Sequence, residues 1–210
     1  MKKRLSTVIY ITLVILLAVS GTLAQFKSAT TSQGNTLEAG KLILYMHDTD
    51  EDISTEWHME NMAPGVSEYI GGNLQLYNNG NIPADNVEIL FNTQCTEKDE
   101  TVSDGVIRKY IKIKYMVYTS PGNSQIKLVD GNGNPTSALK AAIPDFEDNG
   151  NGYVDLEDLD GKTIKGLPAP PVGGKKYCVF GMNTYFDESA TNECQGDKCD
   201  LTLTFTMKQK

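Results

Sequence analysis

Most of the chain alternates hydrophobic and polar residues with a period of two, which is the pattern of β-strands with one buried face. The alternation is clearest in residues 108–118. The side chains of this segment divide into two expected faces, with Ile111, Ile113, Tyr115 and Val117 on one and Lys112, Lys114 and Met116 on the other. Four further segments show the same signal and are expected to form strands, namely residues 41–47, 73–77, 87–91 and 201–207.

Turn-forming sequences separate these strands, because Pro, Gly and Asn gather between the hydrophobic runs, as in residues 78–81 and 120–123. Many short strands separated by such turns predict an all-β fold, an antiparallel β-sandwich. Residues 41–210 are expected to form a single domain of this kind. Its region of about residues 119–166 is expected to be an inserted loop region with a short helix, at residues 137–142 or 156–159.

The first 24 residues have the composition of an export signal peptide. Basic residues at positions 2–4 precede an apolar run from about residue 8 to residue 19, and small residues follow it. We expect cleavage between Ala24 and Gln25, which predicts a secreted protein, extracellular or at the cell surface. The apolar run is shorter than the roughly 20 residues that span a bilayer. An uncleaved anchor is the alternative interpretation.

Residues 25–40 form a polar segment between the signal and the first expected strand. Their main apolar residues are Phe26, Ala29 and Leu37, and no turn signal is present that would fold the segment back onto the following domain. A flexible tether is one interpretation of such a segment.

The charge of the chain limits its partners. Removal of 24 of the 210 residues leaves 186 residues with 16 basic and 27 acidic side chains, a net charge of −11. Because the lysines are also scattered, nucleic acid and anionic lipid are not expected partners. No association with the membrane is expected after signal cleavage.

Four cysteines in an exported chain indicate disulfides. Three pairings are possible. Cys194 and Cys199 enclose a turn-like tetrapeptide, and their closeness in sequence makes them the least costly pair to join. Cys95 would then pair with Cys178 across two strands. Zinc is a competing use of the cysteines, but no histidine lies near Cys194 and Cys199.

Four sequence blocks occur in order along the chain, at residues 21–26 (GTLAQF), 34–44 (GNTLEAGKLIL), 62–89 (beginning MAPGVSEYIGG) and 190–209 (beginning ATNECQGDKCD). Together they resemble the TasA/camelysin family of exported prokaryotic proteins, whose members build extracellular matrix fibres and bundling pili. The resemblance covers about half of the mature chain. It departs from the family at Cys194, where the family usually has tyrosine, and residues 119–166 match nothing that can be aligned.

The resemblance implies a jelly-roll-like β-sandwich. In fibre-forming members the mature N-terminal segment becomes a strand in the neighbouring subunit, so the resemblance implies that residues 25–40 are a donor strand, with Phe26, Ala29 and Leu37 as its apolar contacts. Backbone hydrogen bonds to an exposed sheet edge would hold such a strand. A head-to-tail contact of this kind does not close, and so it propagates into a homopolymer. The resemblance implies a fibre or pilus of this kind, as in a biofilm matrix.

The unmatched region contains a candidate calcium loop, residues 147–158 (EDNGNGYVDLED). Oxygen-bearing residues recur at the spacing of the 12-residue calcium loop, and Gly152 occupies the position where the chain must turn sharply. The candidate ligands are Glu147, Asn149, Asn151, the carbonyl of Tyr153, Asp155 and Asp158. Glu at the first position and Asp at the last depart from the usual loop, and an acidic surface turn is the alternative.

Catalysis is a further alternative, because some members of this family have been described as metalloproteases. His47 and His58 are the only histidines, and there is no H-E-x-x-H motif to place two imidazoles on one zinc ion. We therefore expect a self-assembling structural subunit rather than an enzyme. The alternatives are a secreted metal-dependent peptidase of camelysin type and a monomeric calcium-binding surface module.

Overall fold

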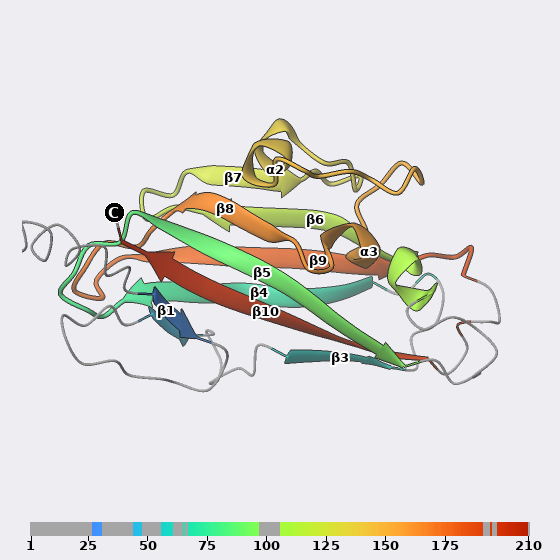
Figure 1. Cartoon of the computed structure of the whole chain (residues 1–210), viewed down its shortest axis with the longest axis horizontal. Helices are drawn as coiled ribbons and strands as arrows, with labels where there is room; N and C mark the ends of the chain where they lie inside the picture. The colour runs from blue at the N-terminus through green and yellow to red at the C-terminus, as the bar shows by residue number, and fades with distance from the viewer. Residues whose placement is uncertain are drawn as a thin grey trace, which may run out of the picture.

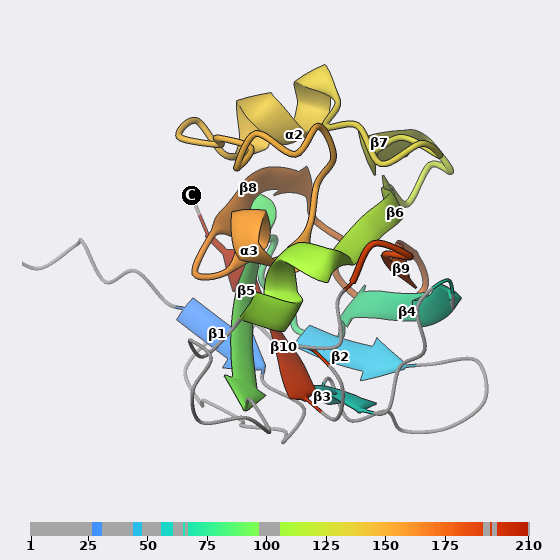
Figure 2. The same ribbon diagram turned by 90° about the vertical axis from the view of Figure 1, so that its right-hand side faces the viewer.

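The chain folds into two antiparallel β-sheets that pack face to face, as Figures 1 and 2 show. A computed structural model describes residues 27–30, 44–47, 56–60, 65, 67–96, 106–190, 194 and 197–209. The arrangement confirms the all-β sandwich that the alternation and turn signals predicted.

The first sheet, called sheet A here, is built around the C-terminal strand. Its strands are β1 (Lys27–Thr30), β3 (Glu56–Glu60), β5 (Asn86–Thr96), β8 (Thr163–Pro168) and β10 (Lys198–Lys208). The order is β1-β10-β5-β8, and β3 also pairs with β10. Since β5 pairs with β10 along its whole length, β1 and β3 share the opposite side of β10.

The second sheet, called sheet B, contains the strands β2 (Leu44–His47), β4 (Ser67–Asn78), β6 (Ile111–Thr119), β7 (Gln125–Val129) and β9 (Tyr177–Phe186). Their order is β2-β4-β9-β6-β7. A 3₁₀ helix, η1 (Val106–Tyr110), precedes β6, so the strand begins later than the expected residue 108.

Two short helices, α2 (Ser137–Ala142) and α3 (Leu156–Leu159), form in the expected insertion, at both of the positions that the sequence offered as alternatives. Each begins at a polar cap, because Thr136 accepts a hydrogen bond from the Leu139 N–H and Asp155 accepts one from the Asp158 N–H. Helix α2 contacts both β7 and β8 and lies across one edge of the sandwich, where Figure 2 shows it above the two sheets.

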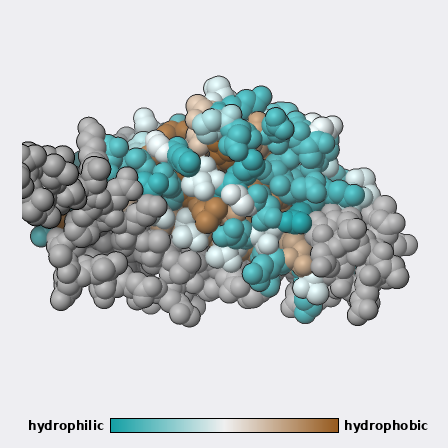
Figure 3. Space-filling view, in the orientation of Figure 1, coloured by the Kyte–Doolittle hydropathy of each residue, from teal (hydrophilic) through white to brown (hydrophobic). Residues whose placement is uncertain are grey.

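The alternation in β10 fills the core between the sheets. Its apolar side chains Leu201, Leu203, Phe205 and Met207 are fully buried, while the threonines between them are partly exposed. Phe205 of sheet A meets Phe180 of sheet B edge to face, with ring centroids 5.7 Å apart. The outer face over β5 and β10 is mainly hydrophilic in Figure 3, with a small hydrophobic patch at its centre.

The expected faces of β6 are correct only for its first half. Ile111 and Ile113 are buried, but the register with β9 shifts between Ile113 and Tyr115, and beyond that point Met116 and Tyr118 are the buried residues. A bulge adds one residue to a strand and thereby exchanges the two faces that follow it. The expectation that Tyr115 and Val117 continue the face of Ile111 is therefore wrong.

The N-terminal segment returns to its own chain. Residues Lys27–Thr30 form β1, which pairs antiparallel with Phe205–Lys208 of β10 in the same molecule. The expectation that this segment would not fold back is wrong, because an antiparallel ladder brings the two ends of the sequence together without a local turn. Among the described residues, no helix has the length and apolar character required to cross a bilayer.

Candidate functional site

The N-terminal segment of the chain pairs with the side of β10 that faces away from β5. The two ends of β10 receive different short strands on this side, because β3 pairs with Lys198–Thr202 and β1 with Phe205–Lys208. The β1 ladder has four residue pairs, Lys27 with Lys208, Ser28 with Met207, Ala29 with Thr206 and Thr30 with Phe205. The sequence predicted that this N-terminal segment would pair as a strand, but it did not identify β10 of the same chain as the partner.

The residues expected to mark the N-terminal segment are only partly described. Ala29 lies in β1 opposite Thr206. Phe26 and Leu37 lie outside the described residues, as do Ala24 and Gln25 at the expected cleavage site. The structure therefore places the backbone of one of the three expected residues opposite β10 of the same molecule.

The expected disulfide pairing is wrong. Cys95 of β5 is bonded to Cys199 of β10, residues that are direct cross-strand partners with Cα atoms 4.0 Å apart. Cys178 lies on β9 in sheet B as a buried thiol, and Cys194 is buried outside this disulfide. Closeness in sequence favoured a disulfide between Cys194 and Cys199. The pairing of β5 with β10 instead places Cys95 beside Cys199. The disulfide ties β10 covalently to β5.

The candidate calcium loop folds onto the cap of helix α3. Asp155 and Asp158 form a reciprocal capping box, in which each carboxylate accepts the backbone N–H of the other residue. Asp155 Oδ2 also accepts the side-chain amides of Asn149 and Asn151, at 2.9 and 2.6 Å. Gly152 has a φ of +84°, a conformation that glycine adopts without steric cost.

Four of the expected ligand side chains therefore converge. Those of Asn149, Asn151, Asp155 and Asp158 are joined by hydrogen bonds, since the Asn149 N–H also donates to Asp158 Oδ1 at 2.9 Å. Glu147 is exposed and makes no hydrogen bond to this group within the described residues. The loop is held against β6 by the Ile113 N–H, which donates to the Val154 carbonyl at 2.8 Å.

The carboxyl groups of Asp155 and Asp158 have raised pKa values. Burial raises the pKa of Asp155, and burial together with the charge of Asp155 raises the pKa of Asp158 to about 6. Asn149 and Asn151 present their amide N–H groups to Asp155, so the loop is a hydrogen-bonded turn whose side chains are of the oxygen-bearing types that calcium sites use.

Within the described residues, no group of three or more His, Cys, Asp or Glu side chains is arranged to hold a metal ion, and this finding includes the carboxylates of the 147–158 loop. His47 lies on β2 of sheet B and His58 on β3 of sheet A, so the two histidines that a peptidase would use come from different sheets.

Comparison with known proteins assigns the chain to a family. The family model described as camelysin metallo-endopeptidase matches residues 1–210, the full length of the sequence. A comparison with curated proteins found no match. The four sequence blocks, the all-β sandwich and the full-length match agree, and the chain belongs to the TasA/camelysin family.

Proposed function

We propose that the protein is an extracellular structural subunit that self-assembles by exchange of its N-terminal strand. In a single molecule β1 covers the Phe205–Lys208 end of β10. In the assembly, the same positions of β10 would receive β1 from another copy. The observation that carries this proposal is the position of β1, which adds one short antiparallel ladder to the edge of a sheet and is far from β2 in sequence.

The connection between β1 and β2 is long enough for exchange. Positions 31–43 separate Thr30 from Leu44 and comprise 13 residues. An extended chain of this length reaches roughly 45 Å. A strand on such a connection can pair within its own molecule or with a neighbour, and only the second mode links molecules.

Exchange replaces one β1 ladder by an identical one, so the two states differ mainly in entropy. The tether gives the internal strand an effective concentration on the order of millimolar. Assembly is therefore favoured by high local protein concentration, or by contacts that only the assembled state makes. Each copy gives one strand and accepts one, so the contact is head-to-tail and extends into a filament.

Removal of residues 25–38 tests this proposal. The truncated chain keeps the strands from β2 onward and should fold, but electron microscopy should show no filaments under conditions in which the complete mature chain forms them. As the matched control, Ala29→Val keeps the backbone N–H, introduces a residue that favours strands and should still assemble, whereas Ala29→Pro removes a backbone donor and should weaken assembly. Filaments of the truncated chain that match wild type would overturn the proposal.

We further propose that residues 147–158 bind calcium. The convergence of Asn149, Asn151, Asp155 and Asp158 supports this proposal. Asp155→Asn keeps an N-cap acceptor but removes a charge, so it should abolish any increase of the melting temperature on calcium addition. Asp148→Asn, a change of the same kind beside the ligand set, should retain that increase. Equal melting of the wild-type protein with calcium and with chelator would leave an acidic surface turn.

Peptidase activity is the second candidate function, and the description of the matching family favours it. Its test is cleavage of an unfolded protein substrate by the purified mature chain, with and without chelator. Cleavage that is lost in His58→Ala but retained in the chain lacking residues 25–38 would support catalysis. Filament formation that is lost in the chain lacking residues 25–38 but retained in His58→Ala would support assembly. The two functions are therefore separable.

A further inference from the structure

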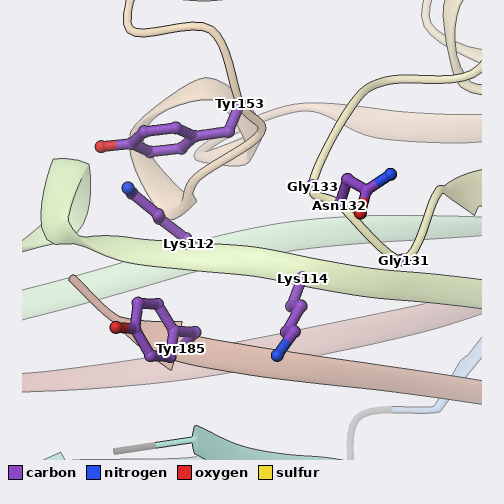
Figure 4. Close-up of a pocket in the computed structure, with 7 residues that line it drawn as sticks. All are labelled: Lys112, Lys114, Gly131, Asn132, Gly133, Tyr153 and Tyr185. Atoms are coloured by element: carbon purple, nitrogen blue, oxygen red, sulfur yellow. The ribbon is translucent and has the colours of Figure 1, made fainter. Parts of the chain in front are cut away.

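A hollow of about 300 Å³ lies over the outer face of β6, on the side away from the core. Figure 4 shows its lining residues. Lys112 and Lys114 project from β6, Tyr185 comes from the neighbouring strand β9, and Tyr153 comes from the 147–158 loop. The turn at residues 131–133 completes the lining. Its volume is at the small end of ligand pockets and suits a ligand of one or two rings.

One of the two lysines is already occupied by the protein. Lys112 forms an ion pair with Asp187, and its ammonium group lies 3.5 Å from the centroid of the Tyr153 ring. The Tyr153 hydroxyl donates to the same Asp187 carboxylate at 3.0 Å. Asp187 thus fixes Lys112 and Tyr153 as a rigid wall and balances the charge of Lys112.

Lys114, in contrast to Lys112, is not ion-paired with a described residue. It is exposed, and its ammonium group lies 6.0 Å from the centroid of the Tyr185 ring. Tyr185 lies on β9, whose pairing with β6 places it opposite Lys112 and next to Lys114. An exposed cation without an ion pair among the described residues, beside an aromatic ring on the neighbouring strand, is a recognition element for an anion attached to a flat or ring-shaped body.

The turn supplies neutral hydrogen-bonding groups on the rim. Asp130 Oδ1 accepts the backbone N–H groups of Asn132 and Asn134, at 2.8 and 2.9 Å, and so fixes the turn. The side-chain amide of Asn132 has no hydrogen-bond partner within the described residues. It can therefore both donate to and accept from a hydroxyl of a ligand.

We propose that this hollow binds a saccharide that carries a carboxylate, such as a uronic acid unit. The Lys114 ammonium would pair with the carboxylate, the Tyr153 and Tyr185 rings would contact the sugar ring, and the Asn132 amide would bond a hydroxyl. These three contacts select for a combination of features. A small carboxylate lacks the ring, and a neutral sugar lacks the charge.

Titration of the chain from Gln25 to Lys210 with a galacturonic acid disaccharide, followed by NMR, tests the proposal. The amide signals of residues 112–114, 131–133 and 185 should shift together. The dissociation constant should be at least about tenfold lower than those for the neutral galactose disaccharide and for acetate. Equal binding of the neutral disaccharide or of acetate, or no binding of the acidic disaccharide, would overturn the proposal.

Matched variants locate the site. Lys114→Gln and Tyr185→Leu should each weaken binding of the acidic disaccharide at least about tenfold. Lys127→Gln, an exposed lysine on the adjacent strand β7, and Tyr177→Leu, an exposed tyrosine on β9, should bind as wild type does. Equal losses in the pocket and control variants would show unspecific charge attraction and would refute the assignment.

Discussion

Replacement of Asp187 by Asn should destabilise the protein by roughly 2 kcal/mol at neutral pH. Burial alone would raise the pKa of Asp187, but hydrogen bonds from Lys112, Ser189 and Tyr153 outweigh it and lower the pKa from 3.8 to about 2. At about 1.4 kcal/mol for each pH unit, this difference corresponds to roughly 2 kcal/mol. The side chain is only 10% exposed, so solvent screens the interaction little. The asparagine would also leave the Lys112 ammonium without its carboxylate.

The sign of the pH dependence follows from the lowered pKa. The stabilisation by Asp187 is complete above the ordinary pKa of 3.8 and is lost as the pH falls toward about 2. Urea denaturation of wild type and Asp187→Asn should therefore differ by roughly 2 kcal/mol at pH 7, equivalent to about 4 to 8 °C in melting temperature, and converge between pH 4 and pH 2. A difference below about 0.5 kcal/mol at pH 7, or one that does not change with pH, would refute this reasoning.

The control for this experiment is Asp145→Asn. Asp145 pairs with Lys162 at 3.2 Å, but its side chain is 80% exposed. Exposed ion pairs contribute little to stability, so this variant should unfold at the same urea concentration as wild type.

Three other outcomes are expected. Non-reducing peptide mapping should recover Cys95 linked to Cys199, and Cys178 as an alkylated thiol; a Cys194–Cys199 peptide would contradict the structure. Cys199→Ser should lower the free energy of unfolding by about 2 to 5 kcal/mol in a denaturant titration, and a loss below about 0.5 kcal/mol would contradict a structural disulfide. Met116→Lys should cost more than about 3 kcal/mol and Val117→Lys less than about 1 kcal/mol in the same assay, because Met116 is fully buried beyond the β6 bulge. The reverse order would show that the alternation continues through the strand.

The sequence was sufficient where local pattern decides the structure. The alternation of β10 predicted its buried side chains, because every second residue is apolar and the strand has no register shift with β5. Helices α2 and α3 were predictable because each follows a capping residue, Thr136 or Asp155. These features depend on neighbours within a few positions of the sequence.

The sequence was insufficient where the structure depends on which strands are neighbours. The bulge in β6 arises in its pairing with β9, and nothing in the order of Ile113, Lys114 and Tyr115 signals the extra residue. The disulfide follows from the β5–β10 pairing, which sequence distance does not reveal. The pocket was missed for the same reason, since Lys114 and Tyr185 lie 71 positions apart and meet only because β6 pairs with β9. Strand order is a long-range property, and sequence periodicity carries no information about it.

Disulfide cross-linking between two chains that each carry one added cysteine tests strand exchange most directly. Ala29 and Thr206 are Cα partners in the β1–β10 ladder, close enough for a disulfide between cysteines at these positions. Ala29→Cys and Thr206→Cys are introduced into separate chains of different mass, which are mixed under assembly conditions and oxidised. Strand exchange predicts a covalent dimer that contains one chain of each kind. A mixture of Ala29→Cys with Lys165→Cys, on β8 at the far side of sheet A, should give none. If filaments form but the Ala29–Thr206 mixture yields no mixed dimer, β1 remains in its own molecule and strand exchange is wrong.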